Sequence, residues 1–569
     1  MPRLLALLLL PLLASPLFAG PTADVMRLVP PKTTVCFVLQ DLRGNAARLS
    51  ESPFAAKFAE SKLGKGLLGS DEMKQLLAAD KVLHDHLGVT AADLLDQVFG
   101  DVVVYAYQPP PDGKDDHDTG VVLGKAAKPD ALAKLAAKLN AAQIKSKELK
   151  GTADKKHNGV GYVERQKADG RTEYYLLRED GLFAYTVQEG VLKQVIDRLS
   201  GADKTPSPLA GAIDQLGVSD AVVVLLFEPK AFAADLAAGE KKADDANQKA
   251  FLKQFGKLWA AAEAVGVSLT LDTGATLAVT VVATPDKVPA ELRGLFKPDA
   301  TPSAVWAVVP SDALLVIGGK FEWEKVTALV GSFLADDGKA GLKALSDDLL
   351  GPAVGKDALP KVKAGLGPDW AVWLTAPAKG DTGVLPAATF AVRVRPPGSD
   401  DDTVGQAIVG AFDAVLHFFR VDYNRTHADQ FTLSEEKADG GAIRYLKNDT
   451  ALPTGVRPAY GLRGDYFVLG SSVAAVKRFT PPKSDAAVKD APLARLNATK
   501  LAEYLTAHGD KLSEALAGWT GTTADKAKTD LTDFAVVLDL FDAIELHHTG
   551  DGKRMTLAIR AKTAKPLRK

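Results

Sequence analysis

The sequence predicts an α+β fold built from two tandem copies of a mainly antiparallel sheet, with helices packed on one face. Short β-branched and aromatic runs come in adjacent pairs joined by short turns, and single helical segments interrupt them. A doubly wound parallel sheet would instead alternate strictly between strand and helix. The second observation is that the chain resembles itself at six places in the same order, which predicts the duplication.

Length and composition set the outer limits. The chain has 569 residues, of which 46% are hydrophobic and 25% are charged, as in soluble globular proteins. This length exceeds one ordinary core, so we expect at least two domains. The formal net charge of −2 gives no basic field that would attract nucleic acid, and we expect no nucleic-acid partner.

The amino-terminal residues, MPRLLALLLLPLLASPLFAG, predict a signal peptide over residues 1–19. Arg3 supplies a positive start, and the apolar run Leu4–Leu13 is too short to span a membrane. Small residues follow, so we expect cleavage near Ala19, with an uncleaved anchor as the alternative. The mature chain is then exported, periplasmic or extracellular, and has no transmembrane span.

The chain contains a single cysteine, Cys36, so we expect no internal disulfide. Cys36 lies in the apolar run TTVCFVL, which predicts a buried strand. We therefore interpret it as a small core residue and not as a reactive thiol.

Six segments of the first half match six segments of the second half. They are, pair by pair, LVPPKTTVCFVL with VVPSDALLVIGG, FGDVVVYAY with LGPDWAVWL, TGVVLGKAAKPDALAKLAAKL with ATFAVRVRPPGSDDDTVGQAIVGAF, LREDGLFAYT with LRGDYFVLGS, PLAGAI with PLARLN, and FGKLWAAAEAVGVSLTLDTGATLAVTVVA with FAVVLDLFDAIELHHTGDGKRMTLAIRA. The two repeats therefore cover residues 25–284 and 303–563. The stretch 285–302 between them is rich in Pro and charge and is expected to be a linker.

Within each half, the sequence periods predict individual elements. VVVYAY and TEYYLL are β-branched and aromatic runs and predict strands. Apolar residues recur at helical spacing in three segments, which predicts three helices. Their apolar positions are Leu132, Leu135, Ala136 and Leu139; Leu192, Val195, Ile196 and Leu199; and Ile408, Ala411, Phe412, Val415 and Phe419.

The phrase LREDGLFAYT and its counterpart LRGDYFVLGS predict a hairpin strand that leads into a capped helix. Asp180–Gly181 and Gly464–Asp465 supply the turns. Thr186 has capping-box spacing to the Glu three residues later, and Ser471 or Ser472 takes its place in the second copy. GSSVA also lies where a hydrolase nucleophile would sit, but its final glycine is missing and it has no evident His or acid partner.

Three Asp-Thr-Gly triplets begin at Asp118, Asp272 and Asp381. Two-lobed aspartic peptidases use one such triplet in each lobe, where paired carboxylates share a proton and activate water. The second-half counterpart of Asp272 has no Asp in the matching place, so we interpret Asp272 as part of a tight turn. Asp118 and Asp381 occupy corresponding loops and are the two candidate catalytic residues, with surface turns as the alternative.

The segment GKGLLG has the glycine spacing of a dinucleotide-binding loop, but it follows a helical pattern and not a strand. Gly64 and Gly66 are therefore expected to end that helix. No other segment suggests a cofactor, and we expect none.

The histidines do not predict a metal site. His84 and His86 are two residues apart in a helical stretch and point to different faces. His547 and His548 are adjacent in a strand and face opposite sides of the sheet. Neither pair has zinc-ligand geometry.

The signal peptide, the opening LVPPKTTVCFVLQDLRGNAARLSESPFAAKF and the repeated α+β halves resemble large exported bacterial proteins of the planctomycete type, which form a family of unknown function. The resemblance extends over nearly all of the mature chain and rests on patterning. It implies no activity and no site residues.

Together these observations predict a non-catalytic binding or structural protein of the cell envelope. Two alternatives remain. Many predicted helices have Ala-rich faces, so the chain could instead carry an apolar ligand between sheet and helices. The Asp-Thr-Gly loops leave an aspartic-peptidase-like hydrolase as the other alternative.

Overall fold

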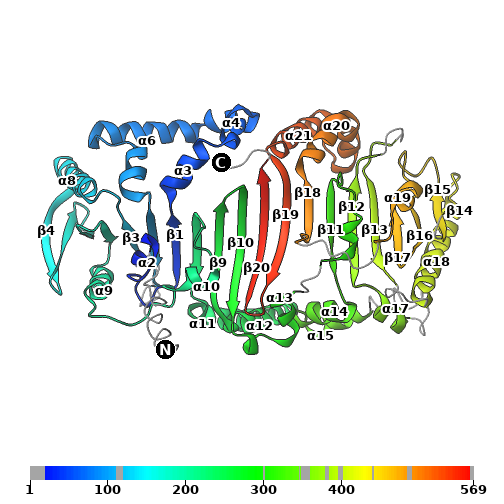
Figure 1. Ribbon diagram of the computed structural model, residues 1–569, viewed down its shortest axis with the longest axis horizontal. Coiled ribbons are helices and arrows are strands. Elements are labelled where there is room, and N and C mark those ends of the chain that lie inside the picture. The colour runs from blue at the N-terminus through cyan, green and yellow to red at the C-terminus, as the bar shows by residue number, and fades with distance from the viewer. Residues whose placement is uncertain are drawn as a thin grey trace, which may run out of the picture.

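The computed structural model describes residues 20–109, 120–298, 302–344, 347, 359–377, 383–394, 402–438, 441–482 and 490–563. Twenty strands among them form one continuous sheet, and every strand pair is antiparallel. Helices surround this sheet, so the predicted α+β class is confirmed (Figure 1).

The first half of the chain supplies one set of strands. They are β1 (Val35–Gln40), β2 (Val102–Tyr107), β3 (Val121–Lys125), β4 (Leu149–His157), β5 (Val160–Lys167), β6 (Thr172–Leu177), β7 (Leu182–Thr186), β8 (Val223–Phe227), β9 (Ala262–Leu271) and β10 (Gly274–Ala283). Their order across the sheet is β4, β5, β6, β7, β3, β2, β1, β8, β9, β10.

The second half supplies an equal number. They are β11 (Leu315–Lys320), β12 (Asp369–Thr375), β13 (Ala387–Arg393), β14 (Thr432–Ala438), β15 (Gly441–Lys447), β16 (Ala459–Arg463), β17 (Tyr466–Gly470), β18 (Ala494–Asn497), β19 (Phe541–Gly550) and β20 (Arg554–Thr563). Their order is β14, β15, β16, β17, β13, β12, β11, β18, β19, β20. Strands that come at the same point in the chain order of each half, such as β1 and β11, therefore occupy the same place in the sheet.

The two sets of strands meet where β10 pairs with β20. Ala278 lies opposite Ala558, and on either side Leu277 and Val279 lie opposite Ile559 and Leu557. The strand order is symmetric about this pair. The halves thus share one sheet, with β4 and β14 at its outer edges.

Helices line both ends of the strands (Figure 1). Along one end lie α3 (Leu42–Ser50), α4 (Pro53–Glu60), α5 (Lys62–Leu68), α6 (Asp71–Leu87), α20 (Ala498–Thr520) and α21 (Ala524–Leu538). Along the other end lie α11 (Ala233–Lys242), α12 (Ala246–Ala261), α13 (Arg293–Phe296), α14 (Trp323–Ser332), α15 (Asp336–Ala344) and α17 (Leu359–Gly365).

The prediction that helices cover one face only is wrong, as the first half shows. α2 (Pro21–Met26), α9 (Glu189–Ser200) and α10 (Ala212–Leu216) pack on the face that carries Cys36, which we name the core face. α8 (Pro129–Lys145) packs on the opposite face with Val122 and Phe183. β3 and β7 are apolar on both faces, and both faces therefore need cover.

The second half is covered in the same way. α19 (Val473–Arg478) packs on the core face with Val316, and α18 (Thr403–Thr426) packs on the opposite face with Phe467. Among the described helices, α18 is the one that is long and apolar enough, by length and composition, to cross a membrane. In the structure its residues Ile408 and Val409 are buried against the sheet, whereas Val415, Phe418 and Val421 in its second half are exposed.

The largest core lies on the core face of the first half. The predicted helix around Leu192, Val195 and Ile196 is confirmed as α9, and these three side chains are fully buried there. Cys36 is fully buried in β1, and burial raises the pKa of its thiol to about 12. A thiol that stays protonated is a poor nucleophile, so the structure agrees with a core role for Cys36.

The structure contradicts two other expectations. The match of PLAGAI with PLARLN is wrong, because the first segment leads into the helix α10 and the second into the strand β18. The stretch 285–302, expected to be a linker, contains short helical turns, and its residues Val288, Leu292 and Phe296 are buried.

Candidate functional site

The two candidate catalytic residues, Asp118 and Asp381, lie outside the described residues. The described glycines of their triplets, Gly120 and Gly383, precede β3 and β13. Eleven strand spacings separate β3 from β13 in the sheet, which is about 50 Å. Two carboxylates share a proton only when they are in contact. This separation gives the aspartic-peptidase hypothesis no support.

The third triplet forms a turn, as predicted. Asp272 follows β9 directly, and the backbone N–H of Gly274 donates a hydrogen bond to its Oδ1 at 3.1 Å. The Asp272 N–H donates to the Gly274 carbonyl at 2.9 Å. This carboxylate therefore closes the β9–β10 hairpin.

The residues expected to cap helices have separate roles. Ser472 is the N-cap of α19 and accepts a hydrogen bond from the Ala475 N–H at 3.1 Å, as predicted for Ser471 or Ser472. Ser471 instead accepts from the Ala388 N–H at 3.0 Å. The capping role predicted for Thr186 is wrong, because α9 begins after Gln188 and no side chain caps it.

Other motifs also lie in ordinary structural positions. Gly64 and Gly66 were expected to end a helix, but both lie inside α5, so GKGLLG has neither a preceding strand nor a loop. His547 is buried on the core face beside Glu545, and His548 faces the other side and contacts the Leu295 carbonyl. Within the described part of the chain, no group of His, Cys, Asp and Glu residues could hold a metal ion.

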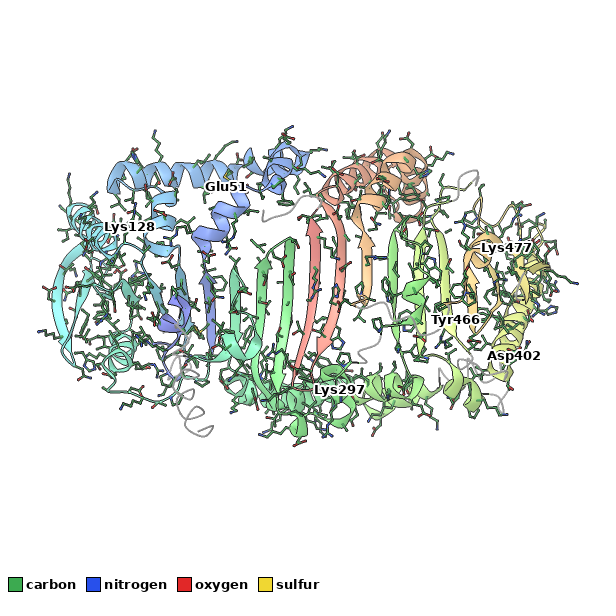
Figure 2. All side chains as sticks on the ribbon, in the orientation of Figure 1. Glu51, Lys128, Lys297, Asp402, Tyr466 and Lys477 are labelled. Carbon is green, nitrogen blue, oxygen red and sulfur yellow. The ribbon has the colours of Figure 1, made fainter. Side chains whose placement is uncertain are left out.

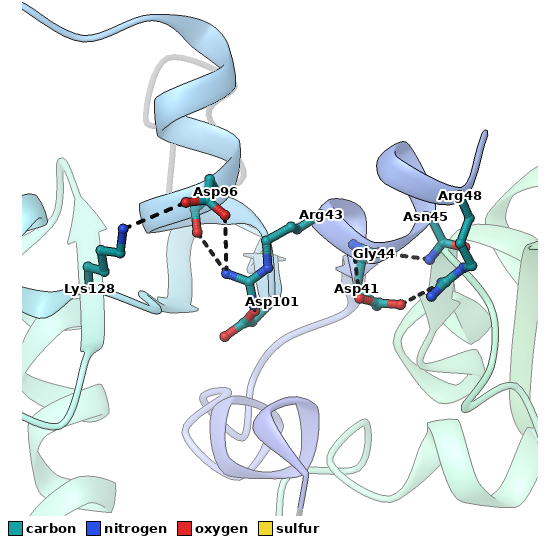
Figure 3. A network of polar contacts seen from close by, with 8 residues as sticks. All are labelled: Asp41, Arg43, Gly44, Asn45, Arg48, Asp96, Asp101 and Lys128. Atoms are coloured by element: carbon teal, nitrogen blue, oxygen red, sulfur yellow. Dashed lines mark hydrogen bonds and ion pairs between the residues drawn. The ribbon is translucent and has the colours of Figure 1, made fainter. Parts of the chain in front are cut away.

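A charged network ties the start of α3 to the end of the segment before β2 (Figure 3). Asp41, at the N-cap of α3, accepts from the Gly44 N–H at 3.2 Å and pairs with Arg48 at 2.6 Å. Arg43 pairs with Asp101 and donates to the Asp96 carbonyl at 2.7 Å. Each of these carboxylates has a cationic partner, so the network serves to anchor the helices that follow β1.

The most deeply buried ion pair lies on the core face of the second half. Asp369 at the start of β12 and Arg393 at the end of β13 are 2.9 Å apart, and both are almost fully buried. Asp369 also accepts from the Ala304 N–H at 2.9 Å. The Arg393 guanidinium lies over the ring of Tyr466, labelled in Figure 2, and burial raises the pKa of that phenol to about 12. The ion pair and the ring contact join β12, β13 and β17 on the core face.

A tyrosine on the third hairpin strand of each half contacts the helix that covers it. The hydroxyl of Tyr460 donates to Asp413 of α18, which also pairs with Arg444. In the first half, Asn140 of α8 donates to the hydroxyl of Tyr175 at 3.0 Å. The two tyrosines correspond in strand register, so these bonds fix α8 and α18 in equivalent places.

The feature that stands out is a band of exposed apolar side chains on the face opposite the core face. We name it the open band, and it crosses eight adjacent strands from β1 to β11. Strand register places on this face Phe37, Leu225, Val267, Val279, Leu557, Leu269, Leu277, Ile559, Leu546, Ala494 and Ile317. The exposed fractions of Leu277 and Ile559, beside the joint, are 49% and 48%. None of the described helices crosses the middle of β9, β10, β20 and β19 (Figure 1).

The opposite side of these central strands is polar. Its residues on β10, β20 and β19 include Thr276, Thr280, Thr556, Arg560, Lys562, Glu545 and His547. Alternation along a strand normally directs apolar side chains to a core and polar ones to water. The central strands are therefore patterned as if the open band were covered.

The open band was not predicted from the sequence. Val267 and Leu269, and likewise Leu277 and Val279, are spaced two residues apart, as on one face of a strand. This alternation predicts strands, but it does not predict which face of the sheet lacks a covering helix. Only the strand order shows that residues from β1, β8, β18 and β11 extend the same surface.

Two cavities lie elsewhere. One, of about 520 Å³, is polar, and its charged lining residues Arg457 and Glu436 pair with Asp449 and Lys477. The other, of about 1170 Å³, is a groove between α4–α5 of the first half and the helical hairpin α20–α21 of the second.

No protein-family model matches this chain, and searches of the curated proteins and of the solved structures found no match. The resemblance to exported planctomycete-type proteins therefore stays a prediction.

Proposed function

We propose that the protein is a non-catalytic binding protein of the cell envelope whose open band holds acyl chains of a lipid. The observation that carries the proposal is the uncovered apolar side of the central strands. Six large apolar residues of the band, Phe37, Leu277, Val279, Ile317, Leu557 and Ile559, have exposed fractions between 39% and 49% and give on the order of 500 Å² of apolar surface. A surface of this size on a monomer typically marks a binding site.

The chemistry of the band favours an acyl chain over a protein partner. Protein interfaces carry about one hydrogen bond per 100–200 Å². The band offers few, because its backbone groups pair within the sheet and its side chains are Leu, Ile, Val, Phe and Ala, apart from His548, which already contacts the Leu295 carbonyl. At the spacing of neighbouring strands, the band is about 34 Å long, enough for an extended lipid chain.

The helices beside the band also favour a narrow ligand. At one end of the strands, α12 and α13 pack over Val281 and Met555, on the same face as the band. At the other end, α20 and α21 pack over Leu496 of β18. Helices therefore flank the band at both ends of the strands, which hinders the approach of a flat protein surface.

We further propose that the chain arose by tandem duplication of one unit. The two halves have the same strand order, and the joint brings Thr276–Val279 (TLAV) against Thr556–Ile559 (TLAI). The duplication would make the open band from two copies of one half-site. The signal peptide predicted over residues 1–19 would deliver the protein to the envelope, where lipids are available.

Lipid extraction tests the proposal. The purified protein is extracted with organic solvent, and bound lipid is quantified by mass spectrometry. We expect acyl lipid in the wild type and roughly tenfold less in the double variant Leu277→Glu/Ile559→Glu, because two carboxylates in the band would have to be desolvated by the chain.

The matched control is Leu76→Glu/Leu77→Glu on α6, which changes two exposed leucines away from the band. Equal lipid content in all three proteins, or no lipid in any, contradicts the proposal. A band that instead covers a second copy of the chain would give a dimer in the wild type and a monomer in the Leu277→Glu/Ile559→Glu variant.

A further inference from the structure

The groove between α4–α5 and α20–α21 has an apolar floor and a charged rim. Its floor is lined by Ala502, Leu505, Leu531, Ala535, Val536 and Leu540. At about 1170 Å³, it slightly exceeds the usual range of ligand sites, about 300–1,000 Å³. It is distinct from the open band, because helices and not strands form its walls.

In the other half of the molecule, aromatic side chains lie at the corresponding joint between helices. There α12 leads into β9 as α21 leads into β19, and Phe251 of α12 lies between Phe255 and Phe333. Its ring centroid is 6.0 Å from that of Phe255 and 5.6 Å from that of Phe333. A stack of aromatic side chains thus joins α12 to the helices that follow β11.

The equivalent aromatic contacts lie beside the groove and not in it: Phe54 of α4 stacks on Phe58 and contacts Phe541 at the start of β19, with ring centroids 6.1 and 6.4 Å apart, and none of the three lines the groove. Counting back from the first residue of the following strand, Phe255 corresponds to Phe534 and Phe251 corresponds to Asp530. Phe534 is as exposed as Phe251, at 48%, and does not line the groove. Where α20 and α21 face the groove, its lining includes the small residues Ala502, Ala535 and Thr532.

The polar lining carries both signs of charge, with four lysines and the four carboxylates Glu60, Glu503, Asp510 and Asp539. Lys57 pairs with Asp539 at 3.1 Å and Lys528 pairs with Asp510 at 2.6 Å. His508 and Lys511 lie one turn apart on α20 and line the groove, and neither has a carboxylate partner among the described residues. An anionic group at the mouth would meet these two side chains.

We propose that this groove binds one amphiphile with a single acyl chain and an anionic headgroup. The chain lies along the apolar floor that Leu505, Leu531 and Val536 help to form, and the headgroup lies beside His508 and Lys511. A free fatty acid and a lysophospholipid share this chemistry. The proposal does not depend on lipid binding by the open band.

Photo-crosslinking locates the site. Stearate with a diazirine in its chain is irradiated with the full-length protein, and labelled peptides are identified by mass spectrometry. We expect labelling of α20, α21 and α5, competed by stearate and by lysophosphatidylglycerol; competition by only one of them identifies the headgroup.

Two tryptophan variants on α21 provide the matched test. Thr532 lines the groove and Thr529 does not, yet both are exposed and each hydroxyl bonds the carbonyl four residues earlier. Thr532→Trp should lower stearate affinity at least tenfold, whereas Thr529→Trp should leave it unchanged. Lys511→Ala should weaken binding of stearate about threefold and that of its methyl ester not at all.

The outcomes separate the two proposals. Labelling confined to β10 and β20, or equal affinity in Thr532→Trp and Thr529→Trp, overturns the groove proposal and leaves the open band in place. Labelling confined to α20 and α21, with lipid content unaffected by Leu277→Glu/Ile559→Glu, supports the groove and contradicts the band.

Discussion

Among single residues, Asp369 has the clearest energetic role. Its carboxylate is buried, and its partner Arg393 is buried as well. Removing one member of a buried pair leaves an uncompensated charge, which costs about 3–5 kcal/mol. We expect Asp369→Ala to lower the free energy of unfolding by this amount, measured by urea denaturation.

The first half offers a control for this variant. Lys125 ends β3 as Arg393 ends β13, and it pairs with Asp24 at 2.7 Å, but both side chains are partly exposed. We expect Asp24→Ala to cost about 1 kcal/mol. Equal losses in Asp24→Ala and Asp369→Ala would show that burial does not set the strength of the pair.

We expect the stability of the folded protein to depend on pH through Glu545. Desolvation alone would raise the pKa of this carboxyl, but hydrogen bonds from His547 and Lys562, each at 3.0 Å, outweigh it and hold the pKa below its ordinary value. The ionised form therefore stabilises the folded state above about pH 4.3, the value for an unfolded Glu. That contribution is lost as the pH falls through the folded pKa.

We expect Glu545→Gln to lower the free energy of unfolding at pH 7 by about 1–3 kcal/mol, because a buried acceptor for two donors is replaced. The difference from wild type should shrink between pH 5 and pH 3. Melting temperatures of both proteins across this range test it, and a constant difference would argue against a titrating Glu545.

Among elements, the β10–β20 pair is the most sensitive. Gly274 begins β10, and an added Cβ there would overlap the backbone carbonyl oxygen of Ala561 on β20. Backbone cannot move aside as a side chain can, so Gly274→Ala should cost about 1–3 kcal/mol. Chemical denaturation of the variant measures this.

A Gly→Ala substitution inside a helix should have the opposite effect on the free energy of unfolding. Gly256 lies inside α12, and an added Cβ there meets nothing within 4 Å. Because Ala favours the helix over Gly, Gly256→Ala should stabilise the protein by about 0.5–1 kcal/mol. A loss of stability in both variants would mean that the joint is not specifically tight at Gly274.

At the scale of the whole molecule, one sheet connects the two halves. β10 and β20 are paired along nine residues each, and Lys57 and Lys62 of the first half pair with Asp539 and Asp533 of the second. We expect a single cooperative unfolding transition by calorimetry, which Gly274→Ala shifts as a whole. Two separated transitions, with only one moved by the substitution, would show that the halves unfold independently.

The sequence by itself determined the element types. The helices around Leu135, Leu192 and Ile408 and the hairpin turns at Asp180–Gly181 and Gly464–Asp465 follow from local periodicity and turn chemistry, and all are present. These features depend on neighbours within a few residues, so the chain encodes them locally. The α+β class followed from their order.

Tertiary structure decided which faces are covered and what lies at the joint. Alternation along β10 shows that Leu277 and Val279 share a face, but only pairing with β20 places them beside Ile559 and Leu557 in the open band. The groove likewise forms from residues more than 400 positions apart, such as Lys57 and Asp539. Periodicity fixes the direction of a side chain relative to its own strand or helix, whereas cover and cavities depend on which distant segments pack there, which no local pattern specifies.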